Sequence, residues 1–288
     1  YNVTSIDTEW FGRNLKKNKK LKIIKIDIRQ INEKYFKNID VVIHLACIAN
    51  DPMTLLKENT SWEISLIGTM RILNYCINNK VKKFIYASSG SVYGIKKEEK
   101  VHEELDLKPI SLYNKIKMTT ERLVLSYSNK IKTTIIRPAT VCGLSPRLRL
   151  DLTVNALTYD ALNKKKINVH GGSQLRPNIH IKDLIRLYIF CTKKNIQGIF
   201  NAGFENLSVL EIAKTVSKKI DCEIIVQKKK IDLRSYKIDS SKILKKGFKP
   251  IYTINDAIDE ISECYKKNNL KISKKNFSIN WLKNEIFR

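Results

Sequence analysis

The sequence of 288 residues predicts an α/β protein whose core is a doubly wound parallel sheet. Short apolar runs end at serine, glycine or an acidic residue, which is typical of buried parallel strands. These runs alternate with stretches of helical periodicity, as repeated strand–helix–strand units require. Past Gly143 the alternation becomes less regular. We therefore expect a sheet domain over residues 1–145 and a smaller lobe over residues 146–288, with some elements of the lobe returning to the sheet.

Composition narrows the class of protein. Hydrophobic residues make up 43% of the chain, and no apolar run reaches the roughly 18 residues that span a bilayer. No secretory signal is visible, so we expect a cytoplasmic protein without membrane segments. The six cysteines are scattered and form no CxxC pair, which favours reduced, buried thiols over a metal site or disulfides.

The net charge of +26 raises the question of nucleic-acid binding. The lysines are spread along the whole chain, however, and only short clusters occur. We interpret them as a solvated surface and do not expect a nucleic-acid partner. Part of the charge is available to attract an anionic substrate such as a nucleotide diphosphate.

Three strands are predicted before the first long helix, over residues 3–6, 21–26 and 41–46. The first ends at Asp7 and the second at Asp27. In a dinucleotide-binding sheet, an acidic residue at such a strand end holds the adenosine ribose, about 20 residues past a glycine-rich turn. No such turn precedes Asp7, so an ordinary surface carboxylate is the alternative. His44 in the third strand is interpreted as a core histidine.

The chain is organised around the strand that ends at Ala87 and the helix predicted over residues 111–127. The strand breaks into a serine and glycine loop that contains Ser89. Ligands of parallel sheets bind beyond the carboxyl ends of the strands, where this loop lies. Tyr113 and Lys117 are four residues apart and share one helix face. A strand-end hydroxyl facing such a pair is an arrangement suited to proton transfer.

The other predicted elements complete the alternation. Helices are expected at 59–78, 151–163, 183–190, 208–220, 240–245 and 254–265, and strands at 132–137, 166–169, 199–201 and 222–226. Ser208 and Glu211 form a capping box for one of these helices.

With these residues placed, the chain resembles the extended short-chain dehydrogenase/reductases, in the UDP-glucose 4-epimerase-like group of NAD-dependent nucleotide-sugar epimerases and dehydratases. Ser-Ser-Gly-Ser-Val-Tyr-Gly resembles the serine loop of that family, and its catalytic hydroxyl corresponds to Ser89. Tyr113 and Lys117 match the YxxxK motif. YxxxK alone is a weak signal, but coupled to the serine loop at this separation it is strong. The resemblance implies a Rossmann-type sheet, a carboxyl-terminal lobe that binds substrate, and NAD as cofactor.

Further matches imply binding residues. They place Asp7, Asp27, Ile28, Leu45, Ala46, Tyr113 and Lys117 at the cofactor, and Ser91, Arg176 and Arg234 at a nucleotide-diphosphate sugar. Asp7 favours NAD because a carboxylate repels the 2′-phosphate of NADP. Guanidinium forks suit a diphosphate, although surface ion pairs are the alternative for both arginines. Members of the resembling family are commonly dimeric, so a homodimer is an open expectation here.

The implied mechanism is epimerisation through a transient 4-keto sugar. Tyr113 would act as the base, Lys117 would lower its pKa, and Ser89 would donate a hydrogen bond to the developing oxyanion. Gly90 and Ser91 stand where 4,6-dehydratases carry an acidic pair, which favours an epimerase. A reductase, decarboxylase or dehydratase of the same family, or a truncated non-catalytic homologue that binds RNA, are the alternatives.

The glycine-rich turn and first strand of the family are absent from the sequence. In a sheet of order 3-2-1-4-5-6 that strand lies in the middle, so we expect the strand at residues 3–6 not to pair with the strand at 41–45. We also expect a fragment that lacks roughly 25 to 30 residues, the length implied by the spacing from glycine turn to acidic residue. A decayed gene product is the competing explanation.

Overall fold

The computed structural model describes residues 1–227 and 235–287. Its largest sheet has four strands in the order β10-β6-β4-β3, and each neighbouring pair is parallel. These strands are β3 (Val41–His44), β4 (Lys83–Ala87), β6 (Lys132–Pro138) and β10 (Gly198–Ala202). The predicted parallel α/β sheet is confirmed. Because the strands are parallel, the carboxyl ends of β4 and β6 meet at one edge.

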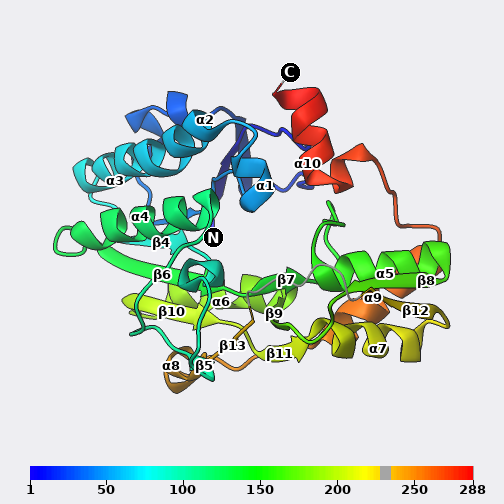
Figure 1. Cartoon of the computed structure of the whole chain (residues 1–288). Coiled ribbons are helices and arrows are strands. Elements are labelled where there is room, and N and C mark those ends of the chain that lie inside the picture. Colours follow the sequence, from blue (N-terminus) through cyan, green and yellow to red (C-terminus); the bar gives the residue numbers. More distant parts are fainter. Residues whose placement is uncertain (228–234, 288) are drawn as a thin grey trace.

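Helices cover both faces of this sheet. Phe84 and Tyr86 of β4 pack into a cluster with residues of α3 (Gly68–Asn78) and α4 (Leu112–Ser126). Ile85, which points to the opposite face, packs with Leu187 of α6 (Ile181–Lys193). Figure 1 shows α3 and α4 together on one side of β4 and β6. The alternation of β4 side chains between two buried clusters explains why this strand is apolar without interruption.

The first two strands form a separate small sheet. β1 (Val3–Asp7) pairs in parallel with β2 (Leu21–Lys25), with Val3 opposite Leu21 and Asp7 opposite Lys25. Within the described residues neither strand pairs with β3, as the sequence led us to expect. Side-chain packing holds the pair in place, because Ile6 contacts the cluster beneath α3.

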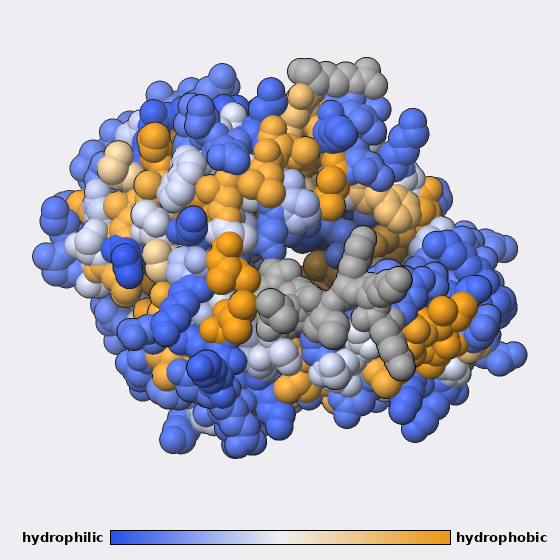
Figure 2. Space-filling view, viewed as in Figure 1, coloured by the Kyte–Doolittle hydropathy of each residue, from blue (hydrophilic) through white to orange (hydrophobic). Residues whose placement is uncertain are grey.

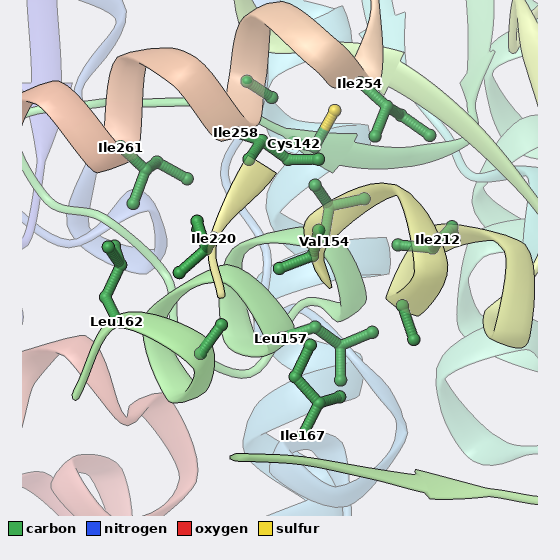
Figure 3. Packing of buried hydrophobic residues seen from close by; sticks show 14 of the residues in the cluster. Cys142, Val154, Leu157, Leu162, Ile167, Ile212, Ile220, Ile254, Ile258 and Ile261 are labelled. Atoms are coloured by element: carbon green, nitrogen blue, oxygen red, sulfur yellow. The ribbon is translucent and has the colours of Figure 1, made fainter. Parts of the chain in front are cut away.

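The carboxyl-terminal part has its own hydrophobic cluster. It is enclosed by α5 (Thr153–Lys164), α7 (Val209–Lys219) and α9 (Ile254–Lys266), and Figure 3 shows Val154, Ile212 and Ile258 pointing toward one another. Its strands are β8 (Lys166–His170) with β12 (Glu223–Gln227), and β7 (Thr140–Cys142), β9 (Leu175–His180) and β11 (Glu205–Ser208) in the order β11-β9-β7. The predicted capping box of Ser208 and Glu211 is confirmed at the start of α7.

Short elements link the two parts. β5 (Lys100–Val101) pairs with β13 (Lys237–Ile238), and α8 (Ser241–Lys245) packs near β10. At the end of the chain, α10 (Ser278–Trp281) returns to the region of β1, where the Trp281 indole donates a 2.6 Å hydrogen bond to the Trp10 carbonyl. Figure 1 shows this red segment beside α1 (Asp51–Thr54), far from α9. No described helix is both long and apolar enough to cross a membrane.

One predicted helix differs from the structure. The sequence predicted a single helix over residues 59–78, but α2 (Glu58–Trp62) and α3 are joined by a widened turn at Glu63–Ile67. The Ser65 carbonyl in this turn accepts hydrogen bonds from the Thr69 and Thr120 hydroxyls. These contacts draw the carbonyl out of the regular helical ladder, which is a physical reason for the wider turn.

Candidate active site

The serine loop begins where β4 ends. The Ser88 amide donates to the Ile136 carbonyl at 2.8 Å, so the loop leaves the sheet beside β6. Ser89 caps the short 3₁₀ helix Gly90–Tyr93 by accepting a 3.2 Å hydrogen bond from the Ser91 amide. The Ser89 and Ser91 hydroxyls are 2.8 Å apart. Two of the predicted site hydroxyls therefore lie together at the carboxyl edge of the sheet.

Helix α4 places the Tyr/Lys pair opposite this loop. Ser111 caps the helix, so Tyr113 lies in its first turn. Lys117 is buried, with 2% of its surface exposed, and its Nζ donates a 2.7 Å hydrogen bond to the Ala87 carbonyl. The same ammonium lies 5.9 Å from the centre of the Tyr113 ring and 5.0 Å from that of Tyr86. The structure thus brings Tyr113, Lys117 and the end of β4 together.

Burial and charge oppose each other at Tyr113. Burial raises the pKa of the Tyr113 phenol above its usual value, while Lys117 and a hydrogen bond from Ser89 pull that pKa down. Lys117 lowers the Tyr113 pKa, as expected, but burial raises that pKa by more. Burial also disfavours the Lys117 ammonium, yet Cys47, Tyr86 and Tyr113 raise its pKa well above the usual value. Lys117 therefore remains a cation beside the phenol.

A cleft of about 550 Å³ opens in front of these residues. Of the predicted site residues, Ser89, Ser91, Tyr113 and Arg176 line it. Figure 2 shows the molecule hollowed near the centre of this face, between its upper and lower parts. Lys117 is buried and does not line the cleft. The volume suits a ligand of nucleotide size rather than a metal ion.

Apart from Tyr113, the predicted cofactor residues do not line this cleft. Asp7, Leu45 and Ala46 are exposed, and Leu45 retains 54% of its surface. The Asp27 carboxylate accepts a 2.8 Å hydrogen bond from Arg29 Nη2. Burial opposes the ionisation of Asp27, but the hydrogen bonds and charge of Arg29 outweigh burial and lower the Asp27 pKa. Ile28 is only 7% exposed and belongs to the hydrophobic cluster beneath α3.

The predicted phosphate-binding arginines are placed only in part. Arg176 lies on β9 in the wall of the cleft, and its Nη1 donates to the Leu175 carbonyl at 2.9 Å. Arg234 lies outside the described residues. Within the part of the chain that the structure describes, no cluster of His, Cys, Asp and Glu is arranged to hold a metal ion.

The sequence reasoning missed two arginines on the loop after β7. Arg149 lines the cleft and donates to both Asp151 oxygens, at 3.0 and 2.7 Å. It also lies near enough to Tyr113 to lower the pKa of the phenol. Arg147 lines the cleft too, and burial and Arg149 lower its pKa to about 10. The signal was the alternation of arginine and leucine in Pro-Arg-Leu-Arg-Leu-Asp, because Leu148 and Leu150 are buried while the two arginines stay partly exposed at the cleft.

Other cleft residues also come from distant parts of the chain. Tyr236 lines the cleft and donates a 2.9 Å hydrogen bond to the Gly90 carbonyl in the serine loop. Asp51 lines the opposite side and accepts from the Ser111 hydroxyl at the start of α4. Neither residue carries a local sequence signal, because each reaches the site only through the long-range topology.

A serine hydroxyl, a tyrosine and a buried ammonium at the carboxyl edge of a parallel sheet are the groups with which an enzyme can move a proton from a hydroxyl group. Comparison with known proteins agrees with this class. The family model described as "NAD dependent epimerase/dehydratase family" matches residues 1–203, and the chain belongs to this family. The match starts at the first residue and gives no support to the expectation of a missing segment.

Individual relatives are distant. A dTDP-D-glucose 4,6-dehydratase from Dictyostelium discoideum is 30% identical over 62% of this chain and 45% of its own length. The chain spans 58% and 62% of two further curated relatives, an uncharacterized UDP-glucose epimerase of Bacillus subtilis and a UDP-glucose 4-epimerase of Lactobacillus helveticus. Among solved structures, the UDP-glucuronic acid 4-epimerase from Bacillus cereus, in complex with UDP-glucuronic acid and NAD, is 29% identical with a TM-score of 0.78 over 87% of this chain and 83% of that one.

Proposed function

We propose that this protein is a nucleotide-sugar epimerase that uses NAD and passes through a transient 4-keto sugar. The observation that carries the proposal is the proximity of Ser89, Tyr113 and Lys117 at the carboxyl end of β4. The choice of an epimerase over a dehydratase rests on Gly90 and Ser91, because no acidic side chain follows the catalytic hydroxyl to eliminate water.

Tyr113, Lys117 and Ser89 have separate roles in the proposed reaction. Tyr113, as phenolate, accepts the proton of a sugar hydroxyl, and the Lys117 ammonium stabilises that phenolate. Ser89 donates a hydrogen bond to the oxygen that gains negative charge. NAD, when bound, supplies reversible hydride transfer. Return of that hydride to the other face of the sugar would leave no net redox change.

Residues of this chain suit both the adenosine end and the nicotinamide end of NAD. The exposed Asp7 carboxylate at the end of β1 suits the adenosine ribose, and Lys117, Leu45 and Ala46 stand near the end of the sheet that would meet the nicotinamide ribose. Asp27 is held by Arg29, which keeps its carboxylate ionised for an adenine partner. The burial of Ile28 leaves it little surface for such a contact. Residues 1–145 would hold the cofactor and residues 146–288 mainly the sugar nucleotide.

Among the described residues, three arginines and two aspartates line the cleft, and this excess of positive charge favours a sugar that carries a carboxylate. Arg176 provides a guanidinium for the diphosphate, with Arg234 as the second predicted contact and Ser91 beside the sugar. Arg149 adds a further positive charge near Tyr113, where the reacting sugar would lie. A uronic acid would use that charge, whereas a neutral hexose would leave Arg149 paired with Asp151.

The test is product analysis with UDP-glucose, UDP-N-acetylglucosamine and UDP-glucuronic acid in the presence of NAD, followed by NMR. We expect the 4-epimer without net NADH consumption, and Tyr113→Phe is expected to lower the rate by about 100-fold or more. Tyr127→Phe, which removes a hydroxyl from the far end of α4, is the matched control. Net NADH consumption, loss of carbon dioxide, loss of water, or no turnover would each overturn the epimerase proposal.

The sugar class has its own readout. Arg149→Met is expected to reduce the preference for UDP-glucuronic acid over UDP-glucose by about 10-fold or more, the loss expected for one charge-assisted contact. Arg122→Met, an exposed change on α4, should leave the preference unchanged. An unaltered preference in Arg149→Met would contradict the uronic acid assignment.

A further inference from the structure

A buried polar network holds the serine loop at both of its ends. At the start of the loop, the Ser88 hydroxyl donates to Glu121 Oε1. Glu121 is paired with Arg137, whose Nε and Nη2 donate to the carboxylate at 2.9 and 2.6 Å. At the end of the loop, the Tyr93 hydroxyl accepts from Arg137 Nη1 at 2.7 Å and donates to Asn201 at 2.8 Å. One ion pair therefore fixes both ends of the segment that contains Ser89.

Glu121 continues the helix face that carries the catalytic pair. Tyr113, Lys117 and Glu121 follow one another at intervals of four residues, so they project from one side of α4. Lys117 holds the Ala87 carbonyl and Glu121 holds the Ser88 hydroxyl. Two consecutive residues at the end of β4 are thus clamped to the helix. The next residue is Ser89, which lines the cleft together with Tyr113.

The Glu121–Arg137 pair is almost fully removed from solvent. Their side chains are 2% and 3% exposed. Burial disfavours the Arg137 guanidinium, but Glu121 raises the pKa of Arg137 above its usual value, so the guanidinium stays charged. Taking both charges out of water offsets most of their attraction, so stability alone is a weak reason for such a pair. Its directional hydrogen bonds, however, define the position of the loop closely.

We propose that Glu121 is a positioning residue, which acts through Ser88 to hold the Ser89 hydroxyl beside Tyr113, where it would donate to the sugar oxygen that Tyr113 deprotonates. This inference rests on the proposed function of Ser89 and Tyr113. Displacement of a reacting group by about 1 Å can cost about 100-fold in rate, so a fixed loop has a direct kinetic consequence.

The experiment begins with Ser88→Ala. This change removes the contact to Glu121 but leaves the Glu121–Arg137 pair intact. We expect kcat to fall by about 10- to 100-fold, with KM for the nucleotide sugar and the melting temperature close to wild type. Ser262→Ala is the matched control, because Ser262 is a buried serine of α9 whose hydroxyl has no partner among the described residues.

A double-mutant cycle separates positioning from a general structural effect. Because Ser88 is proposed to act through Ser89, Ser88→Ala should have little further effect on kcat in a Ser89→Ala background. A wild-type kcat in Ser88→Ala, or full additivity of the two changes, would overturn the proposal.

Crystal structures of the wild type and of Ser88→Ala give a readout that needs no turnover. We expect the Ser89 side chain to shift away from Tyr113 in the variant while β4 and α4 stay in place. An unmoved Ser89 would overturn the positioning role even if the wild type acts on none of the sugars tested. The absence of wild-type turnover would instead refute the proposed function, so the two failures are distinguishable.

Discussion

Replacing Lys117 by methionine tests how the phenol of Tyr113 becomes a base. The Lys117 ammonium lies 5.9 Å from the centre of the Tyr113 ring. If the phenolate charge is placed at that centre, the attraction is about 3 kcal/mol at an effective dielectric constant of about 20. Since 1.36 kcal/mol corresponds to one pKa unit, removal of the charge should raise the Tyr113 pKa by about two units.

The assay is the pH dependence of kcat/KM for the nucleotide sugar. Activity depends on the deprotonated phenol, so kcat/KM rises with pH until Tyr113 is ionised. In Lys117→Met the rising limb should move up by about two units, and at a fixed pH below it the rate should fall about 100-fold. Lys115→Met, an exposed change on the same helix, is the control.

The shape of the pH profile distinguishes an electrostatic role of Lys117 from a structural one. If Lys117→Met lowers the rate by the same factor at every pH, Lys117 acts by holding the Ala87 carbonyl or the cofactor and not through its charge. A rising limb within about half a pKa unit of the wild type would refute the electrostatic reasoning.

Three further outcomes are expected. Arg176→Met should raise KM by about 10- to 100-fold with kcat little changed, whereas Arg122→Met should leave both constants unchanged in the same Michaelis–Menten measurement. Glu121→Ala should lower the free energy of unfolding in urea by about 3–5 kcal/mol, because it leaves a buried guanidinium unpaired. The control is Glu263→Ala, which removes an exposed ion pair and should lower the same free energy by less than about 0.5 kcal/mol. Burial and Lys117 lower the pKa of His44 to about 3, from 6.5 in the unfolded chain. As the pH falls, His44 is therefore protonated in the unfolded chain before it is protonated in the folded protein. Through this group the free energy of unfolding of the wild type should fall by about 2 kcal/mol from pH 7 to pH 5. Urea titrations at the two pH values should show that this part of the fall is missing in the His44→Asn variant.

Local sequence patterns predicted the proposed reacting groups. They did not predict the neighbouring residues of the cleft, which come from distant segments of the chain. Ser89 follows an apolar strand, and Tyr113 and Lys117 are one helical turn apart, so short segments of sequence were enough to bring them together. Arg149 reaches the cleft from a loop of irregular structure, whose path depends on how β7 leaves the sheet. Tyr236 contacts Gly90 from a segment 146 residues further along the chain. No local periodicity reports such a contact.

The sequence also could not predict the net direction of the pKa shift at Tyr113. The pattern predicted that Lys117 lowers the Tyr113 pKa, and the structure places the cation accordingly. The degree of burial, which raises that pKa, depends on packing among α4, β4 and the loop after β3. Likewise, the apolar character of Ile28 fitted an exposed adenine contact as well as a core position, and only the fold shows that it is buried.

The separate sheet of β1 and β2 has a consequence for local unfolding. Within the described residues no backbone ladder joins it to β3, so the pair can open by breaking side-chain packing and the hydrogen bond from Trp281 to Trp10. Its amide hydrogens should exchange with solvent well before those of β4 and β6, whose exchange requires global unfolding. A dinucleotide held at Asp7 would slow exchange in β1 and β2 selectively, because ligand binding stabilises the closed form by mass action. This strand pair would then serve as a built-in reporter of cofactor occupancy.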